Sequence, residues 1–343
     1  MKDKKIHIDG NKLLSTLALV VGIMALMHFG SPLLLPLTVA VMLASLLNGP
    51  TERFKKWGIP GWAAITLSIL LSIVIFLLLS WLISTQFGNM IDQWETIKEK
   101  ASQRLEGITQ WLNDNLNVDY KQYVRSNIDF MGKLETLLSM FASSLSTVLS
   151  QSFIILIYVI LLLMQKSLFV RFFKRLASNE SAMGNILEES SDVITNYLAG
   201  KGKMMVFLFI IYFIGFKVGG VPFALFLALF ATLFSIIPYV GNIIGGGIAI
   251  ILSYLYSGAT PALIVIGVIA AAQVIENYVL TPWIIGDEID LNPFVTIFGV
   301  ILLSWIWGLV GAIIALPVVG VLKVIFEHTQ GMEAYALLLR KKE

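Results

Sequence analysis

The stretch PFALFLALFATLFSIIPYVGNIIGGGIAIILSYLY, residues 222–256, indicates the fold class of this chain. A similar stretch, PFVTIFGVILLSWIWGLVGAIIALPVVGVLKVIF, covers residues 293–326. The two Pro-Phe pairs are 71 residues apart and the two Val-Gly pairs are 70 apart, so a single gap aligns the stretches. Interrupted apolar segments at matching places in two halves of a chain are typical of a transporter binding site. Two unrelated helices kinked by glycine would give the same pattern.

Composition places this chain in a membrane. Hydrophobic residues make up 57% of the 343 residues and charged residues 13%, compared with about 45–50% and about 25% in soluble proteins. The mean hydropathy of +0.84 agrees. We therefore expect an all-α, polytopic helical membrane protein with about eight transmembrane spans, surrounded by membrane lipid. The net charge of +2 is too small to indicate a nucleic-acid partner, which needs a clustered basic surface.

Several kinds of catalytic and metal chemistry lack the residues they need. The chain contains no cysteine, and its three histidines, His7, His28 and His328, are far apart in sequence. No phosphate-binding loop, zinc-protease motif or hydrolase serine motif occurs. We therefore expect no enzyme activity, no metal, no cofactor and no ATP-driven pump.

Charge and apolar runs divide the chain into segments. Near the N-terminus, Ser31-Pro32 splits two short apolar helices at 13–29 and 33–47, because proline cannot continue the helical hydrogen-bond ladder. The expected segments are a basic N-terminus with a membrane hairpin (1–61), a span (62–85), an amphipathic extracellular or periplasmic helical segment (86–147), a span (148–165), a cytoplasmic basic and polar helical segment (166–203), a transport core with two broken-helix hairpins flanking a span at 260–285 (204–326), and a cytoplasmic tail (327–343).

An amphipathic helix is predicted within the polar segment. Apolar side chains recur at spacings of three, four or seven, which indicates a helix over 89–116; they are Ile91, Trp94, Ala101, Leu105, Ile108 and Leu112. Its apolar face has two interpretations. It binds a partner or a second copy, or it packs on the protein's own surface outside the membrane.

Lysine and arginine in the short loops predict the orientation. The N-terminus, 48–61, 166–203 and the C-terminus are all basic and are separated by even numbers of crossings. Both termini are then cytoplasmic. The stretches 222–256 and 293–326 would enter from opposite faces, as inverted repeats do.

Glu276 is the most informative single residue, because it lies in the long apolar segment 260–285. A charge at the centre of a membrane helix costs about 2.5–3.5 kcal/mol on insertion scales, and such residues usually mark transport sites. Gln273 shares the helical face of Glu276, and Asn277 is adjacent. The alternative is a structural acid paired with Lys323 or Lys203.

The remaining candidate site residues lie where the two similar stretches are interrupted. Pro238 and Asn242 flank a break that would free backbone groups to line a cavity. Asn292 and Pro293 begin the second stretch. The three glycines at 245–247 are explained better by close helix packing. The acids Asp287, Glu288 and Asp290 form either a solvated helix end or a vestibule that attracts cations.

A set of motifs in fixed order gives these residues a family resemblance. They are Ile237-Pro238-Tyr239-Val240-Gly241, Glu276-Asn277-Tyr278-Val279-Leu280-Thr281-Pro282, Ile285-Gly286, Leu291-Asn292-Pro293 and Gly308-Leu309-Val310-Gly311 followed by Leu316-Pro317. In this order they resemble the autoinducer-2 exporter family. Asn242 and Asn292 depart from its usual pattern, where proline and histidine are common, and this bears on the substrate more than on the fold.

The resemblance implies export of autoinducer-2, a small polar quorum-sensing signal, across the bacterial inner membrane by a homo-oligomer, which is described as a pentamer in that family. Other members are described as Na⁺/H⁺ antiporters. We therefore expect a secondary transporter that moves a small polar solute outward by alternating access. The alternatives are a monovalent cation/proton antiporter that uses Glu276, and an oligomeric membrane scaffold without transport.

Overall fold

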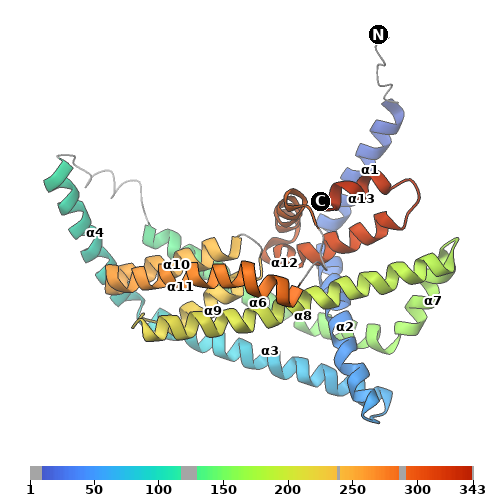
Figure 1. The fold of residues 1–343 in the computed structure, drawn as a ribbon, viewed down its shortest axis with the longest axis horizontal. Coiled ribbons are helices and arrows are strands. Elements are labelled where there is room, and N and C mark those ends of the chain that lie inside the picture. The colour runs from blue at the N-terminus through green and yellow to red at the C-terminus, as the bar shows by residue number, and fades with distance from the viewer. Residues whose placement is uncertain (1–9, 117–129, 238–239, 286–290, 342–343) are drawn as a thin grey trace, which may run out of the picture.

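The computed structural model describes residues 10–116, 130–237, 240–285 and 291–341, and within these ranges the protein is helical (Figure 1). This confirms the all-α fold class. The helices are α1 (Gly10–Phe29), α2 (Ser31–Lys56), α3 (Gly61–Asp92), α4 (Trp94–Leu116), α6 (Phe130–Met164), α7 (Lys166–Leu176), α8 (Glu180–Val218), α9 (Ala224–Phe234), α10 (Val240–Ser257), α11 (Ala259–Ile275), the π-helix η1 (Glu276–Ile285), α12 (Pro293–Glu327) and α13 (Glu333–Leu339).

Several of these helices can cross a membrane. Five in the described part of the chain are long and apolar enough: α2, α3, α8, α11 together with η1, and α12. A sixth is possible where the end of α6, Ser150–Met164, joins α7 through a bend of 73°. Shorter apolar helices, including α9 and the C-terminal part of α1, add to the membrane region. The described part of the chain therefore forms a polytopic helical membrane protein, with five or six helices long enough to span and shorter apolar helices beside them.

The helices run further than the sequence segments predict in two places. The chain does break after α1, but α2 continues through 48–56, which the sequence assigns to a loop, with Pro36 and Pro50 inside the helix. Likewise α8 is one helix of 39 residues, whereas the sequence predicts a polar segment that ends near Lys203 and a separate span. Asn179 caps the N-terminus of α8, because its side chain accepts hydrogen bonds from the backbone N–H groups of Ser181 and Ala182.

Helix α8 is the central helix of the bundle because one of its faces stays buried from Ile194 to Phe216. At about 1.5 Å per residue it is about 58 Å long, and it packs against α2, α7, α9, α11, α12 and η1. The buried positions recur at spacings of three or four, as expected for one helical face; they are Ile194, Tyr197, Lys201, Met204, Leu208, Tyr212 and Phe216.

Two apolar cores meet along this face of α8. The first joins Leu208, Tyr212 and Phe216 to α9, α10 and α11. The second joins Ile194 and its neighbours on α8 to α2 and α12. Lys201 lies between the stretches of α8 that belong to the two cores. The helix therefore places a charged residue at the boundary between two packed halves of the molecule.

The two similar stretches of sequence form two bent units that pack against different halves of α8. In the first, α9 and α10 lie so close that a Cβ on Gly245 would be 2.7 Å from Ala231 Cα. The second, α12, bends at Trp307 and Gly308, where Gly308 adopts a φ of +63°, a conformation that glycine adopts without strain. Figure 1 shows α10 towards the end of the bundle that carries α4 and α12 nearer the end that carries α7.

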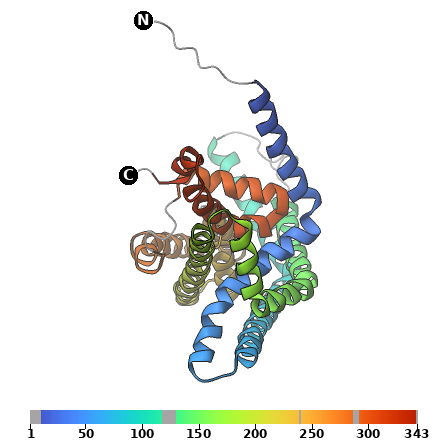
Figure 2. The same ribbon diagram turned by 90° about the vertical axis from the view of Figure 1, so that its right-hand side faces the viewer.

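Helix α4 packs on its own chain. Ile97 and Ala101 are fully buried, and α4 contacts α10 and α3. The ammonium of Lys100 lies 3.7 Å from the centroid of the Tyr256 ring, a cation–π contact that fixes α4 to the end of α10. For this part of the amphipathic face the structure favours packing within the protein over a partner. Figure 2, turned by 90°, shows α1 projecting from the bundle.

Candidate functional site

The membrane helix that carries Glu276 changes its geometry at that residue. The α-helix α11 ends at Ile275 and continues as the π-helix η1 from Glu276 to Ile285. The hydroxyl of Thr281 donates to the backbone carbonyl of Glu276 at 2.7 Å, five residues back. Pro282 lies inside η1 and has no N–H to give to an α-helical ladder. Turns of π-helix are rare and occur frequently at functional sites.

At this change of geometry Glu276 forms a buried ion pair with Lys201. The Nζ of Lys201 lies 3.3 Å from one carboxylate oxygen of Glu276, and Nε2 of Gln273 donates to the other oxygen at 2.9 Å. Glu276 is 7% exposed and Lys201 is 8% exposed. Both oxygens of the carboxylate therefore have a donor from the protein.

The cation in this pair differs from the two that the sequence suggests. Lys203 is exposed on α8, and Lys323 lies 3.9 Å from Glu327; the buried position belongs to Lys201. The sequence alone does not single out Lys201, because this residue lies at the end of the predicted polar segment 166–203. The signal that could have found it is the spacing of three and four that joins Lys201 to Tyr197 and Met204.

Further polar groups on α8 extend the site in both directions. On one side of Lys201, Tyr212 of α8 lies near Gln273 and Glu276. On the other side, the buried hydroxyls of Tyr197 and Ser190 have no hydrogen-bond partner among the residues that the structure describes. Buried polar groups of this kind usually have a partner, so unsatisfied ones need an explanation.

The stability of the buried pair depends on its hydrogen-bond partners. Taking two charges out of water costs several kcal/mol per ion, and their attraction repays this only with good geometry and additional hydrogen bonds. Gln273 supplies one such bond to Glu276. The pair therefore depends on this hydrogen bond as well as on the attraction between its two charges.

The other predicted site residues have different positions. Asn277 is exposed although it is adjacent to Glu276. Asn292 caps α12, where its side chain accepts from the N–H of Phe294 at 2.9 Å, and Pro293 is the first residue of that helix. Among the predicted site residues whose side chains the structure describes, Gln273 and Glu276 are the two that it joins by a hydrogen bond. Pro238 and the three acids at 287, 288 and 290 lie outside the described residues, and Asn242 lies in the first turn of α10.

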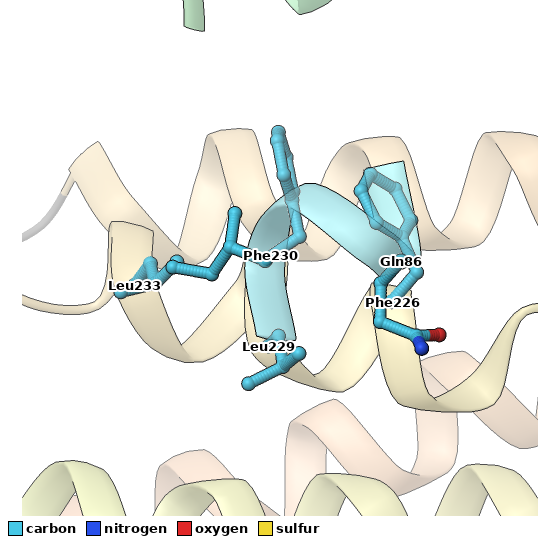
Figure 3. A pocket seen from close by; sticks show the side chains of 6 residues that line it. Gln86, Phe226, Leu229, Phe230 and Leu233 are labelled. Atoms are coloured by element: carbon cyan, nitrogen blue, oxygen red, sulfur yellow. The ribbon is translucent and has the colours of Figure 1, made fainter. Parts of the chain in front are cut away.

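One small cavity lies elsewhere, between the end of α3 and α9 (Figure 3). Its volume is about 10 Å³, space for about one water molecule. It is lined by Ile83, Gln86, Phe226, Leu229, Phe230 and Leu233. A lining of apolar side chains with one amide gives no basis for recognising a polar solute, and the cavity is too small to hold one.

Comparison of the sequence with known proteins identifies a family. The family described as "AI-2E family transporter" matches residues 17–331. The chain is 24% identical over 340 residues to "AI-2 transport protein TqsA" of Escherichia coli (strain K12), covering 97% of both chains. It is 30% identical over 319 residues to "Putative transport protein YueF" of Bacillus subtilis (strain 168), covering 87% of this chain and 84% of the relative. With a family match over nearly its whole length and a bundle of membrane-spanning helices, this protein belongs to the AI-2E family of transporters.

Proposed function

We propose that this protein is a secondary transporter that exports a small, polar, uncharged solute of the autoinducer-2 type from the bacterial cytoplasm by alternating access. The observation that carries the proposal is the buried Lys201–Glu276 pair at the break between α11 and η1. Ionisable residues inside membrane segments commonly mark the path of a solute or ion. The name of the Escherichia coli relative supports autoinducer-2 as the solute class.

The chemistry of the pair fits a neutral polar solute. Lys201 donates hydrogen bonds, Glu276 accepts them, and Gln273 can do both. The two opposite charges of the pair cancel. A charged solute would carry the same sign of charge as one member of the pair and would be repelled by it. Hydroxyl and carbonyl groups of a small solute can take the place of the contact between Lys201 and Glu276 without a change in the total charge of the site.

Alternating access would use the two bent units. The α9–α10 unit packs on the half of α8 that carries Leu208 and Tyr212, and α12 packs on the half that carries Ile194. Lys201 lies between these halves. If each unit moves against its own half of α8, the site opens towards one side of the membrane at a time, as in transporters built from repeats. Tyr197 and Ser190 would then contact the solute on one side of the pair.

The second candidate function is exchange of a monovalent cation for a proton. The observation that favours it is that Glu276 already binds a cation, the ammonium of Lys201, at 3.3 Å. A sodium ion or a proton on the carboxylate would replace Lys201 as the counter-charge. In this mechanism the carboxylate itself must titrate, whereas in the solute mechanism hydrogen bonding carries recognition.

The experiment that tests the proposal is transport by the purified protein in liposomes, with autoinducer-2 flux and Na⁺-dependent proton movement measured in parallel. Glu276→Gln keeps the size and an acceptor oxygen but removes the charge. We expect wild-type flux of autoinducer-2 that falls about tenfold or more in Glu276→Gln, the loss of about 1.4 kcal/mol or more of solute interaction. Glu95→Gln is the matched control, since Glu95 belongs to an exposed pair on α4.

The outcomes separate the alternatives. Autoinducer-2 flux that depends on Glu276 but not on Glu95 supports the proposal. Sodium-dependent proton movement without autoinducer-2 flux overturns it in favour of the exchanger. If the wild-type protein shows neither activity, the proposal is overturned in favour of the membrane scaffold.

A further inference from the structure

Helix α7 has a cationic face and an apolar face, and it is short. Arg171, Lys174 and Arg175 are spaced by three and four residues or lie next to one another, so they share one side of the helix. The opposite side carries large apolar residues that are 40–71% exposed, and no residue of the helix is buried. These apolar residues are Leu168, Phe169, Phe172, Phe173 and Leu176.

The position of α7 relative to the preceding span is close to perpendicular. It leaves Ser150–Met164 through a bend of 73°. With 11 residues it is about 16 Å long, too short to cross a bilayer that needs about 20 residues. A helix at this angle to an upright span lies near the plane of the membrane surface.

Contacts within the protein fix α7 in this position and leave its apolar face uncovered by the described part of the chain. Lys174 packs on α8, where a Cβ on Gly184 would lie 3.0 Å from Cε of Lys174. Lys166 donates to Oδ1 of Asn48 on α2 at 3.0 Å. One flank of α7 is therefore held by its neighbours, whereas Phe172 and Leu176 remain 57% and 71% exposed.

The turn between α2 and α3 contributes the same kinds of residue. Arg53, Lys55 and Lys56 lie in the last turn of α2, and Trp57 and Trp62 are each 74% exposed. Figure 1 shows this turn and α7 at the end of the long helices away from α4. We call α7 together with residues 53–57 the basic–aromatic surface.

We propose that the basic–aromatic surface binds anionic phospholipids, with α7 lying in the headgroup region. Amphipathic helices with basic and aromatic residues bind at this depth by burying their apolar face among acyl chains. Lysine and arginine there attract anionic headgroups, and tryptophan prefers the interface. A second copy of the chain on this surface would bring like charges together. The proposal is independent of the solute that the protein transports.

The test uses the full-length protein in nanodiscs. The chain contains no cysteine, so Phe172→Cys gives one site for a polarity-sensitive fluorophore on the apolar face. Quenching by nitroxide-labelled phosphatidylglycerol is compared with quenching by nitroxide-labelled phosphatidylcholine. We expect blue-shifted emission and stronger quenching by phosphatidylglycerol than by phosphatidylcholine. The double variant Arg171→Gln with Arg175→Gln should reduce this preference by about fivefold for each of the two cations that it removes.

Two matched variants complete the test. Arg171→Lys with Arg175→Lys keeps both charges and should keep the preference. Lys98→Gln with Arg104→Gln removes the same charge from α4, at the other end of the molecule, and should leave it unchanged. Equal quenching by the two lipids overturns the proposal, as does a preference that the Arg→Gln variant retains. A label that no lipid quenches also overturns it, because protein would then cover this face.

Discussion

Two Lys–Glu pairs in this protein have the same separation in different surroundings. The nitrogen–oxygen distance is 3.3 Å for Lys201–Glu276, where α8 meets η1, and 3.3 Å for Lys98–Glu95 on α4. The side chains of the first pair are each 10% exposed, whereas those of the second are 38% and 87% exposed. The distance between two charges therefore does not tell which pair matters.

The difference between the two pairs is the loss of water. On α4 Glu95 is open to water and Lys98 is partly exposed, so the pair adds little to stability and each member can be replaced. At the crossing of α8 and η1 the charges depend on one another and on Gln273, so removing one member leaves the other buried without its counter-charge. Four substitutions test this difference between the pairs, beginning with the one that should change stability most.

Removing one charge of the buried pair should have the largest effect. Lys201→Met should lower the free energy of unfolding by about 3–5 kcal/mol, because the carboxylate of Glu276 loses its buried counter-charge. Unfolding in mild detergent measures this. Lys201→Met with Glu276→Leu should recover most of the stability while transport stays lost. A single variant as stable as the wild type would show that the pair is hydrated and resembles the one on α4.

Removing the second donor to Glu276 should have an intermediate effect. Gln273→Leu should cost about 1.5–3 kcal/mol, the range for a hydrogen bond to a charged group, because one carboxylate oxygen loses the bond of 2.9 Å. The same unfolding measurement applies. Gln273→Glu should be at least as damaging, since it places a second negative charge beside Glu276. An effect below that of the α4 variants would contradict the role given to Gln273.

Removing the hydroxyl that bonds to the start of η1 should have a smaller effect. Thr281→Val keeps the shape of the side chain but removes the bond to the carbonyl of Glu276, so about 1 kcal/mol of stability should be lost. Thr66→Val is the control, since the Thr66 hydroxyl bonds to the Trp62 carbonyl at an exposed position on α3. If both variants lose the same stability, the π-helical turn has no special dependence on Thr281.

Removing a charge from the exposed pair should have the smallest effect. Lys98→Gln should change stability by no more than about 0.5 kcal/mol, and the change should shrink further at high salt. Unfolding at low and high ionic strength tests both statements. A loss of stability comparable to that of Lys201→Met would mean that α4 is buried in an assembly. The amphipathic face of α4 would then bind a partner.

The sequence predicts that Gln273 and Glu276 lie together, and the structure shows their contact. The rarity of an acid in an apolar segment identifies Glu276, and the spacing of three residues places Gln273 on its face, where the structure has it. Lys201 is hidden from the same reasoning because flanking polar residues resemble a loop. Asn277 is predicted from adjacency, but the next residue along a helix points about 100° away, and Asn277 is exposed.

Hydrophobicity and the positions of proline and glycine are properties of the sequence alone. They determined the all-α membrane fold and the two interrupted units, and they singled out Glu276 as an acid within an apolar segment. The tertiary structure decided that 180–218 is one helix, that Lys201 is the partner of Glu276, and that the two units pack on different halves of α8. The physical reason is that the cost of burying a charge depends on which side chain from a distant segment meets it. Lys201 and Glu276 are 75 residues apart, and no local pattern connects them.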